Sequence, residues 1–138
     1  MHRRRGSRAA PGGRPHDGQA ARSRHIHTAD LAGTVDFYVD VIGLEEGKRP
    51  TTLARPGAWL YCNGRPLIHL NEIEQSHSPG TGAIDHVAFE TENYDEVAAK
   101  LTKRGLPFEA KELPDVKVRQ IFVRDPNGVK LELNFRGN

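Results

Sequence analysis

An internal duplication constrains the fold of this chain more than any other feature of the sequence. Residues 23–72 and residues 83–136 follow one pattern, which is a short strand, a helix that ends at a glycine, and three further strands. The letters repeat as well, since Ile68-His69-Leu70-Asn71 in the first copy matches Leu131-Glu132-Leu133-Asn134 in the second. The sequence therefore predicts an α+β fold built from two βαβββ modules, 23–72 and 83–136.

The helix of each copy is marked at both ends. In the first copy, Asp30 can accept the free N–H groups of the first turn, and Gly43 permits the left-handed residue that ends a helix. In the second copy, Asn93 and Gly105 take the same two places. Between them, apolar residues recur on one helical face at Leu31, Val35, Tyr38 and Ile42, and again at Tyr94, Val97, Ala98 and Leu101.

Short apolar runs bounded by turn residues predict the strands. Asn63-Gly64 indicates a tight hairpin, Asp125-Pro126-Asn127-Gly128 a second turn, and residues 73–82 a polar linker between the copies. The expected strands are 23–28, 44–49, 58–62, 66–72, 84–91, 108–113, 118–125 and 129–135.

Three polar residues stand in otherwise apolar strand patterns: His69, His86 and Glu132. Alternate side chains of a strand point to opposite faces, so each lies opposite its apolar neighbours. Two imidazoles and a carboxylate on the non-core faces of three strands suit a divalent metal ion. The alternative for each residue alone is an ordinary structural role.

The charge of the chain is unevenly distributed. Residues 1–24 contain seven arginines and one aspartate, so this segment carries +6 and the rest of the chain −4, for a total of +2. An acidic body argues against a nucleic-acid-binding face. Residues 1–22 lack Leu, Ile, Val and every aromatic residue, which predicts a disordered Arg-rich tail before a folded domain over 23–138.

The remaining composition indicates a cytoplasmic protein without membrane contact. No apolar run approaches the ~20 residues of a membrane span, and none resembles the core of a secretory signal. Cys62 is the single cysteine, so the chain cannot form an internal disulfide and fits a reducing compartment.

Several segments together resemble the vicinal oxygen chelate superfamily, which holds glyoxalase I, extradiol dioxygenases, fosfomycin-resistance transferases and bleomycin-resistance proteins. The resemblance covers about residues 23 to 136. It is carried by Thr28-Ala29-Asp30-Leu31, Phe37-Tyr38, Val41-Ile42-Gly43-Leu44, Ile84-Asp85-His86-Val87-Ala88-Phe89, and Asp125-Pro126-Asn127-Gly128 with Leu131-Glu132-Leu133. It implies that the two modules form an open, cup-like mixed sheet around a metal ion, as in the glyoxalase-like fold.

The resemblance also implies which residues bind the metal. His86 and Glu132 match family ligands, and His69 matches the place that glyoxalase I fills with a glutamate. The fourth ligand lies seven residues before the helix cap, as His86 does before Asn93, and the same count from Asp30 reaches Ser23. His25 shares its strand face, but reaches the metal only through a bulge or a shifted strand.

Two classes of function follow from the resemblance. The first is an enzyme that uses a divalent metal (Zn, Fe, Mn, Ni or Co) on a small substrate with vicinal oxygens, as a lyase, an isomerase or a ring-cleaving dioxygenase. Glu132 is its candidate catalytic base, and Gln120 and Phe122 are its candidate substrate contacts. The second is a metal-free, small-molecule-binding protein of the bleomycin-resistance type. A homodimer is expected for both.

Overall fold

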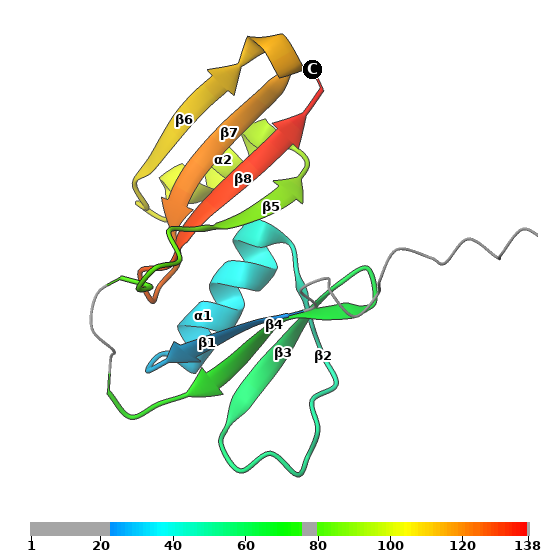
Figure 1. Ribbon diagram of the computed structural model, residues 1–138, viewed down its shortest axis with the longest axis vertical. Helices are drawn as coiled ribbons and strands as arrows, with labels where there is room; N and C mark the ends of the chain where they lie inside the picture. Colours follow the sequence, from blue (N-terminus) through cyan, green and yellow to red (C-terminus); the bar gives the residue numbers. More distant parts are fainter. Residues whose placement is uncertain (1–22, 76–79, 138) are drawn as a thin grey trace, which may run out of the picture.

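Two four-stranded sheets, each with a helix against one face, make up the part of the chain that the structure describes (Figure 1). The structure is a computed structural model that describes residues 23–75 and 80–137, and the predicted tail over residues 1–22 lies outside the described residues. The first module contains β1 (Arg24–Thr28), α1 (Leu31–Phe37), the π-helical turn η1 (Tyr38–Ile42), β2 (Glu45–Gly47), β3 (Gly57–Cys62) and β4 (Arg65–Glu72). The second contains β5 (Val87–Thr91), α2 (Tyr94–Lys103), β6 (Phe108–Leu113), the 3-10 turn η2 (Pro114–Val116), β7 (Val118–Arg124) and β8 (Lys130–Arg136).

The two sheets share one topology, which confirms the duplicated α+β fold. The first sheet has the order β1-β4-β3-β2 and the second the order β5-β8-β7-β6. In each sheet the first and last strands of the module pair in parallel, and the remaining pairs are antiparallel. Both sheets are therefore mixed, and neither closes on itself.

Strand alternation decides which face of each sheet is buried. On β4, Ile68 and Leu70 are buried while His69 is only partly covered, and on β8 Leu131 and Leu133 are buried on either side of Glu132. The buried faces of both sheets, together with the helices, form one continuous hydrophobic core. His69 and Glu132 thus lie on the faces opposite the core, as expected, whereas His86 lies outside a strand.

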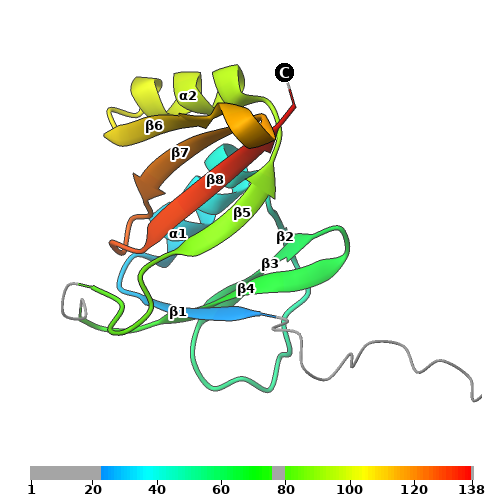
Figure 2. The ribbon, with the colours of Figure 1, turned by 45° about the horizontal axis from the view of Figure 1, so that its top comes forward.

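Helix α1 belongs to the first module but also packs against the second. Figures 1 and 2 show it on the face of the first sheet that turns toward the second module. The Tyr38 hydroxyl donates a hydrogen bond to Asp125 Oδ2 at 2.7 Å, and Asn127 Nδ2 donates to Thr34 Oγ1 at 3.1 Å. The Asp-Pro-Asn-Gly turn therefore joins the modules as well as the strands β7 and β8.

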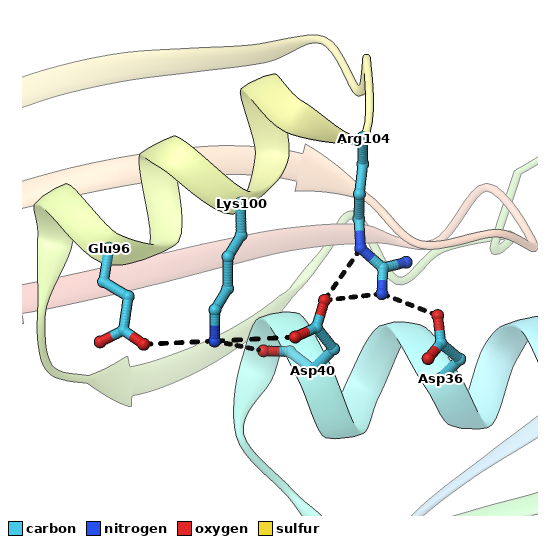
Figure 3. Close-up of polar contacts among 5 residues, drawn as sticks. All are labelled: Asp36, Asp40, Glu96, Lys100 and Arg104. Atoms are coloured by element: carbon cyan, nitrogen blue, oxygen red, sulfur yellow. Dashed lines mark hydrogen bonds and ion pairs between the residues drawn. The ribbon is translucent and has the colours of Figure 1, made fainter.

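An ion-pair network on the surface reinforces the same joint (Figure 3). Arg104, which follows α2, places Nη2 at 2.7 Å from both Asp36 Oδ2 on α1 and Asp40 Oδ2 on η1. Lys100 lies 3.7 Å from Asp40 and 3.3 Å from Glu96. These contacts link α2 of the second module directly to α1 and η1 of the first module.

The first helix differs from the regular helix that its periodicity predicts. After Phe37 the chain widens into a π-helical turn before Gly43, whose φ of 88° ends it as expected. Phe37 and Tyr38 both face the core, while the predicted face residues Leu31, Val35 and Ile42 are only partly buried. The buried stripe is formed by Thr34, Phe37, Tyr38 and Val41, so it lies about one residue earlier than the predicted one.

The start of β5 and the cap of α2 also differ from the sequence expectation. The strand expected from residue 84 begins at Val87, so Ile84 is 63% exposed and His86 lies just before the strand. Asn93 occupies the cap position of α2, but its φ is 64° and its side chain makes no capping hydrogen bond.

Candidate functional site

The first half of the candidate site is a cluster of rings on the outward face of the first sheet. His25 on β1 lies directly opposite His69 on β4, and their ring centroids are 4.7 Å apart in an edge-to-face arrangement. On the other side of His69, Trp59 of β3 stacks on the imidazole at 3.9 Å with an interplanar angle of 8°. His69 is therefore held between two aromatic neighbours.

Burial at this place favours the neutral form of the His69 imidazole. Its pKa is lowered, first by burial and then by His25, while a backbone hydrogen bond with Pro66 acts in the opposite direction. The Nε2 atom is buried and has no hydrogen-bond partner among the residues that the structure describes. A neutral imidazole with an unpaired buried nitrogen is suited to bind a metal ion or a ligand donor.

The second half of the site lies on the outward face of the second sheet. His86 Nε2 and Glu132 Oε1 are 3.9 Å apart, and the Glu132 side chain is 20% exposed. Asn134, also on β8, donates from Nδ2 to Glu132 Oε2 at 3.0 Å, and Gln120 of β7 donates to Asn134 Oδ1 at 2.9 Å. This chain of amides orients the carboxylate and leaves Oε1 directed at the histidine.

His86 has a second carboxylate neighbour. Its Nδ1 atom is 2.8 Å from Asp85 Oδ2, and Lys130 Nζ is 3.7 Å from the same oxygen. The hydrogen bond with His86, followed by the charge of Lys130, lowers the pKa of the Asp85 carboxyl. Asp85 is thus ionised at neutral pH beside an imidazole whose other nitrogen faces Glu132.

The two predicted substrate contacts differ in their availability. Phe122 on β7 is the cross-strand neighbour of Glu132, and its half-buried ring has Lys111 Nζ at 5.2 Å and Lys130 Nζ at 5.5 Å from the centroid. Gln120 uses its amide N–H on Asn134, so its first role in this structure is to support that residue. An aromatic ring flanked by two ammonium groups is the part of this face best suited to contact a substrate.

Strand register settles which residues are equivalent in the two modules. His25 pairs with His69 on the parallel strands of the first sheet, and Ala88 pairs with Glu132 in the second. His86 lies two residues before Ala88, so its equivalent in the first module is Ser23. The imidazole of His25 takes the place of Ala88, one pleat further along the strand, and yet contacts His69 directly.

The described part of one chain brings the predicted ligands together as two pairs. His25 and His69 meet on the first sheet, and His86 and Glu132 meet on the second. Within residues 23–75 and 80–137, no group of three or more His, Cys, Asp or Glu lies close enough to hold a metal ion. The first pair lies on the first sheet and the second pair lies beside the second sheet, so the described part of one chain does not bring the two pairs together.

Three supporting residues were missed by the strand pattern or given another role. Trp59 stacks on His69. Asp85 and Asn134 contact His86 and Glu132, and neither carried a predicted role. Each was open to prediction, because Asn134 lies two residues from Glu132 on the same strand face and Asp85 is the direct neighbour of His86.

No helix in the described ranges is long and apolar enough to cross a membrane.

Among curated proteins, the chain is 30% identical to Glyoxylase I 4 of Arabidopsis thaliana over 117 residues, which is 78% of this chain and 67% of that protein.

Solved structures with the same fold come from several bacteria. A glyoxalase/dioxygenase from Nostoc punctiforme has a TM-score of 0.74 at 17% identity, covering 96% of this chain and 99% of that chain. A putative glyoxalase family protein from Bacillus anthracis has a TM-score of 0.65 at 26% identity, covering 88% and 100%. A variant of the fosfomycin resistance protein of Listeria monocytogenes, complexed with Mn(II) and 1S,2S-dihydroxypropylphosphonic acid, has a TM-score of 0.68 at 17% identity, covering 86% and 93%.

The sequence model of one protein family matches nearly all of the described chain. It matches residues 21–133, which include the first module, the Asp-Pro-Asn-Gly turn and the second module as far as Leu133. The chain therefore belongs to the Glyoxalase/Bleomycin resistance protein/Dioxygenase superfamily.

Proposed function

We propose that this protein is a metal-dependent enzyme that acts on a small substrate with vicinal oxygens, as a lyase, an isomerase or a ring-cleaving dioxygenase. The observation that carries the proposal is the His86–Glu132 pair, in which a carboxylate oriented by Asn134 faces an imidazole nitrogen at 3.9 Å. Membership of the superfamily supports it, as does Mn(II) in the structurally similar fosfomycin resistance protein.

The residues of the site fit a divalent metal ion. Imidazole nitrogen and carboxylate oxygen suit Zn, Fe, Mn, Ni and Co, and His69 adds a buried Nε2 without a hydrogen-bond partner among the described residues. His69, His86 and Glu132 would hold the ion, with His25 as the candidate for a fourth place. Bound there, such an ion would act as a Lewis acid that stabilises negative charge on neighbouring oxygens of a substrate.

A second copy of the chain completes the site in this proposal. Each chain carries both halves of the ligand set, but on outward faces of two sheets whose arrangement is held by α1. A two-fold dimer that sets the first sheet of one copy against the second sheet of its partner forms two equivalent sites. The expected homodimer therefore follows from the same geometry as the expected metal site.

Glu132 is the proposed catalytic base. A carboxylate oxygen can take a proton from a substrate carbon when it is free of other strong partners. Oε2 accepts from Asn134, whereas Oε1 has only the 3.9 Å approach of His86. Phe122, with Lys111 and Lys130 beside its ring, provides the proposed substrate contact, and this pair of cations suits a substrate with an anionic group.

Metal analysis of protein purified without chelator tests the proposal most directly. About one divalent ion per chain is expected in the wild type. His86→Ala and Glu132→Ala should each remove it, because each deletes a ligand of the second sheet. Glu90→Ala is the matched control, since Glu90 is an exposed carboxylate on β5 that pairs with Arg136 at 3.0 Å.

Size determination of the same preparations tests the dimer. A monomer that binds one ion per chain would contradict the shared site, and a dimer that binds none would contradict the metal-dependent enzyme. The exposed Cys62 is compatible with the cytoplasmic location that we propose for the enzyme, because a reducing compartment keeps an exposed thiol free.

One observation favours a second candidate, a metal-free binding protein of the bleomycin-resistance type. His69 lies between Trp59 and His25, so the first sheet presents an aromatic surface that can stack against a planar ligand. This function requires no metal, and it loses nothing from Ser23 in the fourth ligand place. Protein free of metal that still forms dimers would favour this candidate.

A further inference from the structure

Asp85 approaches His86 on the side away from Glu132. Its Oδ2 atom lies 2.8 Å from Nδ1, whereas Glu132 Oε1 lies 3.9 Å from Nε2. The two ring nitrogens therefore face two different carboxylates. Asp85 itself is exposed, so its role depends on what holds its side chain in this place.

The direction of the hydrogen bond follows from the charge of Asp85. An ionised carboxylate can only accept hydrogen bonds, so Nδ1 must carry the proton that it donates. A neutral imidazole has a single N–H, and Nε2 is then left with its lone pair. Nε2 is also the atom that faces Glu132.

Lys130 holds Asp85 from the strand that carries Glu132. Its ammonium nitrogen is 3.7 Å from Asp85 Oδ2, and Lys130 lies two residues before Glu132 on the same face of β8. Asp85 is thus linked to the strand that carries Glu132 by one exposed ion pair. The first module offers no histidine at the equivalent place, since Ser23 stands there.

We propose that Asp85 is a positioning residue that fixes His86 in the Nδ1–H form and so presents the Nε2 lone pair beside Glu132. This deepens the proposed function, and its consequence for metal binding rests on that function. The tautomer itself does not rest on the proposed function, because it is a property of the metal-free chain. Partners of this kind orient metal-binding histidines in many proteins and commonly contribute 10- to 100-fold to metal affinity.

The first measurement is the tautomer of His86 by nitrogen NMR of the metal-free, full-length protein at pH about 8, well above the ordinary histidine pKa. In the wild type, the ring shifts should show a protonated Nδ1 and an unprotonated Nε2. Asp85→Ala should move His86 toward the Nε2–H form that a solvated histidine side chain prefers. Asp85→Asn should retain the wild-type form, because the amide oxygen still accepts from Nδ1.

Glu90→Ala is the control, since this exposed carboxylate on β5 contacts Arg136 rather than His86. It should leave the His86 shifts unchanged. A wild type with the Nε2–H form, or an Asp85→Ala variant with wild-type shifts, would overturn the proposal. A merely structural role for Asp85 would not change the tautomer of a neighbouring ring.

The second measurement is the affinity for Zn²⁺ alone, by competition with a chelator. Asp85→Ala should weaken binding by about 10- to 100-fold, and Asp85→Asn by less. Unchanged affinity in Asp85→Ala would overturn the positioning role even if the tautomer changes. If no variant and no wild type binds Zn²⁺, the proposed metal-dependent function fails, while the NMR result still decides whether Asp85 sets the tautomer.

Discussion

The Tyr38 hydroxyl donates a 2.7 Å hydrogen bond to Asp125 Oδ2 across the boundary between the two modules, and both side chains are buried. Asp125 uses its other oxygen to accept from the backbone N–H groups of Asn127 and Val129. One carboxylate therefore closes the Asp-Pro-Asn-Gly turn and binds the first module. Burial and Asp125 together raise the pKa of Tyr38, so the phenol stays protonated and remains the donor.

Tyr38→Phe should destabilise the protein by about 1.5–3 kcal/mol, because Asp125 Oδ2 loses its donor in a buried position. Urea unfolding at neutral pH measures the change. Tyr61→Phe is the matched control, since this half-buried tyrosine donates only to the backbone oxygen of Lys48 in an exposed setting. A loss for Tyr38→Phe no larger than that of the control would mean that the modules are joined by other contacts.

Arg104→Gln should cost at most about 1 kcal/mol, because ion pairs with exposed partners are weakened by solvent. The pKa shift of Asp40 also determines how this contribution to stability changes with pH. The hydrogen bond with Arg104 is the largest cause that lowers the pKa of Asp40, so this stability is present above the ordinary carboxyl pKa and is lost as the pH falls through the folded value. The difference between wild type and Arg104→Gln should therefore vanish in acid.

Denaturant unfolding at a series of pH values checks this expectation. Lys103→Gln serves as the control, since it removes a neighbouring cation at the end of α2 that has no part in the network of Figure 3. If the cost of Arg104→Gln persists at the lowest pH at which the protein folds, the guanidinium acts through packing rather than through Asp36 and Asp40.

Ser23→His should tighten the binding of a divalent ion by about tenfold, because strand register makes Ser23 the equivalent of His86 and an added imidazole supplies one more ligand. His25→Ala should change the affinity little, while His86→Ala should abolish binding. Chelator competition gives all three affinities. If His25→Ala loses metal as completely as His86→Ala, then His25 is the fourth ligand despite lying one pleat further along β1.

Protonation of His69 should destabilise the protein. Its pKa is lowered from the ordinary value of 6.5, so the unfolded chain binds a proton more readily than the folded one. The free energy of unfolding should therefore decline as the pH falls from 6.5 to the lower pKa that His69 has in the folded protein. The variant His69→Gln should lack this part of the decline. His27→Gln is the control, because His27 is exposed on β1.

Trp59 gives an independent measurement of the same event, since it is the single tryptophan and stacks on His69. A charged imidazole at 3.9 Å from the indole should change its fluorescence over the same pH range. Unfolding curves of wild type and His69→Gln that fall in parallel below pH 6.5, with no change in Trp59 emission, would show that His69 does not gain a proton there.

Local pattern was enough to predict the sheets and the outward faces. Ile68 and Leu70 are buried around His69, and Leu131 and Leu133 around Glu132, because strand alternation depends only on the residues of that strand. The equivalence of Ser23 and His86 was also within reach, since each lies seven residues before the cap residue of its helix.

The arrangement of the two modules was not predictable in the same way. It depends on contacts between distant residues, such as Tyr38 with Asp125, that no periodicity reveals. The π-helical turn over Tyr38–Ile42 was not predicted either, because the apolar spacing there is that of a regular helix. The sequence predicted a single site formed by His69, His86 and Glu132, and it did not predict that one chain divides these residues between two sheets.

The π-helical turn has a consequence for how such a duplicated chain folds. A first copy expressed by itself would leave the hydroxyl of Tyr38 and the apolar surface around Val41 without the second copy that covers them. The two modules thus share one strand order, but the first module depends on the second to cover part of its core. We expect the described chain to unfold in a single cooperative transition, and a cut in the linker over 73–82 to yield fragments that are stable only when they reassemble.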